Sequence, residues 1–156
     1  MVIKLDTDLN EELEKIGFNE YNKIIINPEE YAESKWQIVE IINQNYSKVL
    51  KNKFDLYNWL YHNKNDEVAY FLNEAGSNAL NYSEFKMPAK FHLWLGYKGF
   101  IIGIEQQGRG FNAAKIDQEK IRENEGAAFQ FYRNCKSTVF FDDPEEARIV
   151  YLVYLF

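Results

Sequence analysis

The segment KFHLWLGYKGFIIGIEQ, residues 90–106, decides the fold of this chain. Two apolar runs flank Lys98-Gly99, a pair that suits a tight turn, so the segment predicts an antiparallel hairpin of strands 90–97 and 100–106. The second run is apolar almost throughout, which is typical of a central strand buried on both faces. We therefore expect the rest of the chain to build a sheet around this hairpin.

Three other segments have the composition of strands. The run YNKIIIN is rich in β-branched residues and predicts a strand at 22–26. Near the other end, STVFFDD (137–143) and ARIVYLVYLF (147–156) predict two strands that pair around a turn at Pro144. These pairs predict a mixed, mostly antiparallel sheet.

Helical periodicity marks two long segments and two shorter ones. Asn27 and Pro28 suit the start of the first long helix, and Pro88 lies beyond the end of the second. The expected helices span 7–16, 28–50, about 66–83 and 127–135. Their expected buried positions are Tyr31, Ile38, Ile41, Ile42, Tyr46 and Val49 in the first long helix, and Val68, Phe71, Leu72, Ala75, Ala79 and Tyr82 in the second.

Helices interleaved with antiparallel strands predict an α/β (α+β) fold. We expect a two-layer sandwich in which helices cover one face of the sheet. The chain of 156 residues suits a single domain. Within it we expect an N-terminal extension over 1–21 and the domain proper over 22–156.

Composition and charge argue against nucleic-acid partners, membrane insertion and secretion. A formal charge of −6 and an isoelectric point near 5.0 argue against a protein that tracks nucleic-acid phosphates. The first residues carry acids where a signal peptide needs an apolar stretch, and no run is long enough for a membrane span. Because Cys135 is the only cysteine, no internal disulfide can form, and a reducing compartment is favoured. We expect a cytoplasmic protein.

A polar stripe runs along the second long helix in the stretch EAGSNALNYS, residues 74–83. Glu74 and Asn78 lie one turn apart on the same helix face, and Asn81 continues their line. Such a stripe is most often a solvated or capping feature. A functional role is indicated when the stripe is combined with the glycines that lie beyond the hairpin.

Glycines mark the exit of the predicted central strand and the start of the last helix. Gly108 and Gly110 lie directly after the strand, and Gly126 precedes the helix at 127–135. Glycine permits close approach of backbone to a ligand, and a helix N-terminus offers unpaired amides to a phosphate. The polar stripe and the glycines together indicate a phosphate-containing ligand.

In this order, the motifs resemble those of the histidine-kinase-type ATPase superfamily, the GHKL or Bergerat fold. The closest likeness is to stand-alone anti-sigma-factor serine kinases. EAGSNALNY is similar to the family's first motif, QQGRGFN to its Asp-x-Gly-x-Gly motif, and GAAFQFYRN to its last glycine motif. The resemblance covers about residues 22–156 and implies a Bergerat-like sandwich.

The resemblance also implies a chemistry, with ATP and Mg²⁺ as cofactors. Asn78 matches the ligand of the Mg²⁺ that bridges the phosphates, and Glu74 matches the catalytic carboxylate. It further implies ATP hydrolysis or phosphoryl transfer to a protein partner such as a sigma-factor-like regulator, with homodimerisation as a further contact. The nucleotide-binding set would be Asn78, Asn81, Gln106, Gly108, Gly110, Lys115 and Gly126, with residues 111–125 as the lid.

Two positions depart from the family pattern. Gln106 stands where the family has the aspartate that accepts a hydrogen bond from adenine, and Ala128 stands where it has a second glycine. An amide oxygen still accepts a hydrogen bond, but without the strength of a carboxylate. Two alternatives therefore stay open: a module of the same fold that has lost the nucleotide and acts through protein contacts or dimerisation, and an unrelated α/β domain.

The remaining reactive side chains indicate no further site in the sequence. We interpret His62 and His92 as structural, the latter because it alternates with apolar residues on a strand. Cys135 has no evident charged neighbour, so we expect a small core residue.

Overall fold

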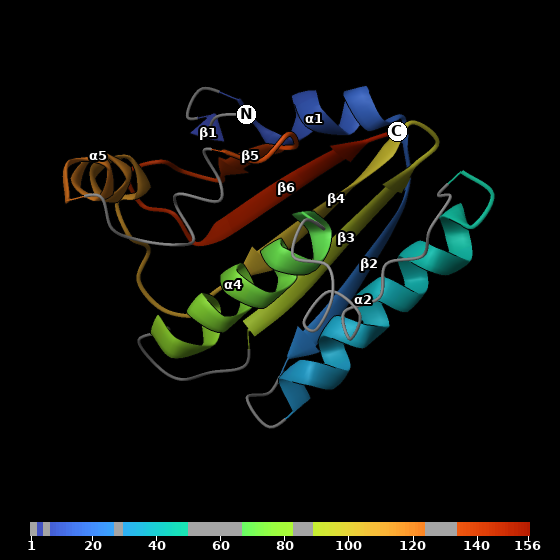
Figure 1. Ribbon diagram of the computed structural model, residues 1–156, viewed down its shortest axis with the longest axis horizontal. Coiled ribbons are helices and arrows are strands. Elements are labelled where there is room, and N and C mark those ends of the chain that lie inside the picture. Colours follow the sequence, from blue (N-terminus) through green and yellow to red (C-terminus); the bar gives the residue numbers. More distant parts are fainter. Residues whose placement is uncertain (1–2, 5–6, 27–29, 50–66, 83–88, 124–133) are drawn as a thin grey trace.

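The computed structural model describes residues 3–4, 7–26, 30–49, 67–82, 89–123 and 134–156, and the described strands form one six-stranded sheet (Figure 1). The sheet has the strand order β1-β5-β6-β4-β3-β2. Neighbours among β2 to β6 pair antiparallel, and the short β1 pairs parallel with β5. The strands are β1 (Ile3–Lys4), β2 (Phe18–Ile26), β3 (Ala89–Gly96), β4 (Gly99–Glu105), β5 (Thr138–Phe141) and β6 (Ile149–Leu155).

The hairpin of β3 and β4 lies within the sheet, as expected, although its turn is one residue earlier than predicted. Tyr97 and Lys98 form the turn, while Gly99 already belongs to β4. A Cβ atom at Gly99 would lie 2.1 Å from the carbonyl oxygen of Tyr154, so this close strand contact requires glycine. The Tyr46 hydroxyl accepts the Gly96 N–H at 2.9 Å and lies 2.7 Å from the Gly96 carbonyl oxygen, which anchors the turn to a helix.

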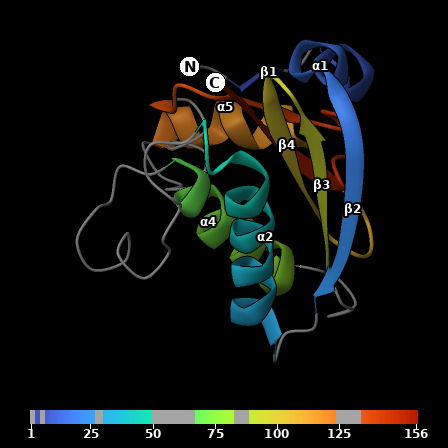
Figure 2. The ribbon, with the colours of Figure 1, turned by 90° about the vertical axis from the view of Figure 1, so that its right-hand side faces the viewer.

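The two long helices α2 (Tyr31–Tyr46) and α4 (Glu67–Tyr82) lie on one face of the sheet (Figure 2). Their predicted apolar stripes are buried where the side chains are described, except that Ile41 is half-buried and Val49 is exposed. Val49 is wrong as a core position: α2 ends before it, and it is 53% exposed. The confirmed core positions are Ile38, Ile42 and Tyr46 in α2 and Val68, Phe71, Leu72 and Ala75 in α4; the side chains of Tyr31, Ala79 and Tyr82 lie outside the described residues.

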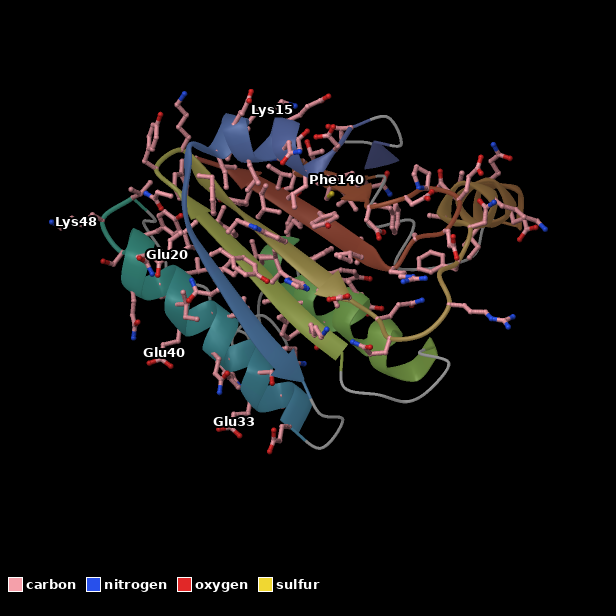
Figure 3. The ribbon with its side chains drawn as sticks, turned by 180° about the vertical axis from the view of Figure 1, so that it is seen from behind. Lys15, Glu20, Glu33, Glu40, Lys48 and Phe140 are labelled. Carbon is pink, nitrogen blue, oxygen red and sulfur yellow. The ribbon has the colours of Figure 1, made fainter. Side chains whose placement is uncertain are left out.

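The short helix α1 (Leu9–Ile16) packs on the opposite face of the sheet, so helices are not confined to one face (Figure 3). Asp8 caps its start by accepting the Glu11 N–H at 2.9 Å, and Gly17 ends it in the left-handed conformation. Ile16 is fully buried. This second cluster also contains Trp94, Ile101, Phe140, Tyr151 and Val153.

The described elements form the expected α+β fold, with a mostly antiparallel sheet and two long helices layered on it. Its N-terminal part differs from expectation in one respect. β2 begins at Phe18, so the boundary expected between 21 and 22 falls inside a strand. Within the described residues, no helix has the length and apolar character needed to cross a membrane.

Two buried tyrosines make the fold sensitive to alkali. Burial raises the pKa of the Tyr46 and Tyr151 hydroxyls above the ordinary value, and Asp142 and Glu105 add to the effect at Tyr151. Since an unfolded tyrosine ionises near pH 10, this stabilisation is complete below about pH 10 and is lost as the pH rises towards the folded values. We expect the Tm to fall above about pH 10 and to fall less steeply in Tyr151→Phe. An alkaline slope unchanged in both Tyr151→Phe and Tyr46→Phe would contradict this assignment.

Candidate functional site

The glycine-containing loop, residues 106–112, joins β4 to the helix α5 (Ala113–Glu123). Both of its ends are fastened to the connection between β5 and β6. The Gln106 N–H donates to the Arg148 carbonyl oxygen at 2.9 Å. Phe111 and Ala147 exchange backbone hydrogen bonds of 3.0 and 2.7 Å. The loop is therefore held at a defined place beyond the end of a central strand.

Both glycines of this loop have a local reason to be glycine. Gly108 has φ 103°, a backbone conformation that side chains disfavour. A Cβ atom at Gly110 would lie 2.5 Å from the Glu146 carbonyl oxygen. The conformation of the loop therefore requires glycine at both positions. A role of these glycines in phosphate binding would come in addition to this structural requirement.

Gln106 turns its carboxamide back along the loop. Its Nε2 donates to the Arg109 carbonyl oxygen at 3.0 Å. This hydrogen bond uses only the nitrogen of the carboxamide. The carboxamide oxygen is the atom that would accept a hydrogen bond from an adenine amino group. Glu105 does not take the place of Gln106, because it contacts His92 on the opposite face, as strand alternation predicts.

The predicted lid is helical over most of its length. Asn112 caps α5 by accepting the Lys115 N–H at 2.8 Å, and the Ala114 N–H donates to the Pro144 carbonyl oxygen at 3.2 Å. The Lys115 side chain is 71% exposed, and its Nζ lies 3.9 Å from the Glu119 carboxylate. An exposed pair of this kind contributes about 0.3–0.5 kcal/mol, so little energy is lost if Lys115 moves to an anion.

Glu74 lies on α4, which packs on β3, β4 and β6, and its side chain is half-buried. Together with burial, its charge raises the pKa of Tyr70, one turn earlier. Asn78 and Asn81 lie on the last turns of the same helix, but their side chains are outside the described residues. Gly126 and Ala128, with most of the helix expected at 127–135, fall in the undescribed segment 124–133.

The helix α4, which carries the polar stripe, and the glycine-containing loop are connected through the sheet. α4 packs on β4, the strand that leads into the glycine loop (Figure 1). Among the described side chains, no hydrogen bond or ion pair joins Glu74 to Gln106 or Lys115. No three His, Cys, Asp or Glu side chains of the described part gather as metal ligands. The oxygen donors of Glu74 and Asn78, one helical turn apart, suit a hard cation by chemistry.

The first residue of α4 fastens the helix to the residues that lead into β5. The Glu67 carboxylate accepts hydrogen bonds from the Lys136 N–H, the Ser137 N–H and the Ser137 hydroxyl, the last at 2.7 Å. Next to this contact, Cys135 is buried, and its thiol donates to the Ser137 carbonyl oxygen. Burial and the charge of Glu67 raise the pKa of Cys135 to about 11, which disfavours a reactive thiolate. The expectation of a small core residue is confirmed.

One group of side chains is not evident from the sequence. Tyr21, His92 and Glu105 form a hydrogen-bonded chain across three adjacent strands. The alternation of β3 places His92 on the face opposite Phe91 and Leu93. This alternation is the only feature of the sequence that indicates a polar position for His92 on that face. Its partners come from other strands, and only the sheet register brings them to it.

Comparison with known proteins assigns no family to the chain. No protein-family model matches the sequence, and no curated protein matches it.

Proposed function

We propose that this chain is a cytoplasmic, stand-alone regulatory protein that binds Mg-ATP, and that it hydrolyses ATP or transfers its phosphoryl group to a protein partner. The order of its elements carries the proposal. A helix with a Glu74-Asn78 stripe precedes the β3–β4 hairpin, and a loop that requires glycine at 108 and 110 lies at the exit of β4. Their likeness to the motifs of anti-sigma-factor serine kinases supports this chemistry.

Each residue has a separable task in this proposal. Asn78 holds the Mg²⁺ through its amide oxygen, and Glu74 accepts a proton from the attacking hydroxyl or water. The amides of the glycine loop and of the segment after Gly126 face the phosphates, with Asn81 beside them. Lys115 offsets phosphate charge, which an acidic protein needs locally. Bound Mg²⁺ would spread the charge that develops during phosphoryl transfer.

The test is a calorimetric titration with ATP, with and without Mg²⁺. Binding should require the metal, and Asn78→Ala should weaken it at least about tenfold, equivalent to about 1.4 kcal/mol. Glu74→Ala should retain binding and lose turnover. Asn45→Ala is the matched control, because Asn45 is an exposed helical asparagine on α2 whose side chain donates to the Ile41 carbonyl oxygen. Its affinity should equal that of the wild type.

Adenine recognition gives a second arm of the same titration. Gln106→Asp should tighten ATP binding relative to GTP, because a carboxylate is the stronger acceptor for the adenine amino group. Unchanged affinity in this variant would mean that residue 106 does not face the base.

A module of the same fold without nucleotide is the second candidate. Residue 106 favours it, because a glutamine stands where the family has the aspartate that accepts a hydrogen bond from adenine, and an amide oxygen is the weaker acceptor. A wild-type protein that shows no heat and no Tm shift at millimolar ATP would contradict the first proposal. The chain would then act through protein contacts or dimerisation.

A further inference from the structure

A tyrosine, a histidine and a glutamate form a continuous hydrogen-bonded chain on the sheet face opposite α2 and α4. The Tyr21 hydroxyl lies 2.7 Å from Nδ1 of His92, and Nε2 of the same ring lies 2.8 Å from the Glu105 carboxylate. Figure 3 views this face, with α1 across one end beside Phe140. Because the proposed nucleotide motifs involve α4 on the other face, this group is independent of the proposed function.

The chemistry of the three groups fixes the direction of each hydrogen bond. A carboxylate only accepts, so Nε2 of His92 carries the proton and donates to Glu105. In the neutral imidazole Nδ1 is then the unprotonated nitrogen, and it accepts from the Tyr21 hydroxyl. Burial and the charge of Glu105 raise the pKa of Tyr21, so the phenol keeps its proton at neutral pH. The order is that of a nucleophile, a base and a group that orients the base.

The surroundings protect the base and leave the hydroxyl-bearing residue accessible. Tyr21 is 45% exposed on the edge strand β2, whereas His92 is 9% exposed. The imidazole is stacked on Trp94 at 5.6 Å and lies beside the Tyr21 ring at 5.9 Å. These ring contacts hold His92 in place, so the base is pre-positioned for a group that approaches from solvent.

The charges near this site do not form a site for an anionic substrate. Glu105 acts on Tyr21, and Asp142 acts on neighbouring Tyr151. The strand register places Lys90 opposite Glu105 and Lys23 opposite His92, so acidic and basic residues alternate here. An uncharged activated ester needs no charged group to hold it, and it is the electrophile that suits a phenol beside an imidazole base.

We propose that Tyr21 is an acyl-acceptor site in which the phenol attacks an uncharged activated ester and His92 takes its proton. The Tyr21 oxygen forms a bond to the ester carbonyl carbon, and the bond from that carbon to the leaving alkoxide or phenolate oxygen breaks. The proton passes from Tyr21 to Nδ1 of His92 and then to the leaving group. Glu105 is a positioning residue, which orients the imidazole and stabilises its charged form.

The experiment exposes the full-length protein to 4-nitrophenyl acetate at neutral pH. Released nitrophenolate is followed by absorbance, and the acetylated residue is located by peptide mass spectrometry. We expect one equivalent of fast release and acetyl on Tyr21. Tyr97 is the internal control, because it is 71% exposed and should react at the rate of an ordinary phenol.

Variants distinguish acetylation assisted by His92 from acetylation that results only from the solvent exposure of Tyr21. Tyr21→Phe should abolish the fast phase, and His92→Gln should slow acetylation of Tyr21 at least tenfold. Glu105→Gln should slow it as well, while Glu105→Asp should recover part of the rate because it restores the carboxylate. The rate at Tyr97, measured in the same sample, calibrates the reagent, and the Tm of each variant reports whether it remains folded. Acetylation of Tyr21 no faster than that of Tyr97, or an unchanged rate in His92→Gln, would overturn the proposal.

Discussion

Replacing Gly96 by alanine is expected to destabilise the protein by about 3 kcal/mol or more, comparable to the most damaging single substitutions. A Cβ atom at this position would lie 2.1 Å from the Ile16 carbonyl oxygen and 2.8 Å from that of Gly17. The obstacle is backbone, and the Lys98 N–H holds the Ile16 carbonyl in place at 2.9 Å. Relief therefore requires α1 to move away from the hairpin, which exposes the cluster around Ile16.

Thermal denaturation checks this result with a control from the same sheet. At about 2–4 °C per kcal/mol, we expect Gly96→Ala to lower the Tm by about 6–12 °C. Gly103→Ala is matched in chemistry, but its nearest neighbours are the rings of Trp94 at 3.0 Å and Tyr151 at 3.2 Å. Side chains adjust more readily than backbone, so this variant should lose less. Equal Tm values for the two variants would mean that α1 is not fixed by the contact at Gly96.

Elements with a strong local pattern are predictable from the sequence. The β3–β4 hairpin and the strands around Pro144 are confirmed, because alternation and turn residues act over a few positions. The apolar stripe of α4 is confirmed at Val68, Phe71, Leu72 and Ala75 for the same reason. Such patterns report the period of an element and which of its faces is apolar.

The docking of α1 could not be predicted in this way. Its buried apolar side chain, Ile16, belongs to a cluster with residues from four strands that are distant in sequence. The sequence shows a short polar helix, whereas its packing on the second face depends on the order of the strands. The division of the chain at residue 21 stays a prediction, while α1 itself packs against the sheet through Ile16.

The candidate sites show the same division between local and distant causes. The sequence marks Gly108 and Gly110 as special, but the reason at Gly110 is the backbone of Glu146, which the fold brings beside it. The sequence alone indicates a structural role for His92, because Tyr21, its partner, lies 71 positions earlier. A hydrogen-bonded chain across strands becomes visible only when the register is known. The roles of Glu74 and Asn78 stay predictions that the titration tests.

Phe71→Ala is the second substitution with a large expected effect, and it separates stability from binding on α4. Phe71 is fully buried, so the change should cost about 3–5 kcal/mol and lower the Tm by about 6–20 °C. Trp36→Ala removes an aromatic ring that is 44% exposed on α2, and it should cost less than half as much. Glu74→Ala, one turn from Phe71, should leave the Tm within a few degrees of the wild type while it abolishes turnover. If instead Glu74→Ala destabilises as strongly as Phe71→Ala, the carboxylate supports the fold, and the catalytic role proposed for it fails.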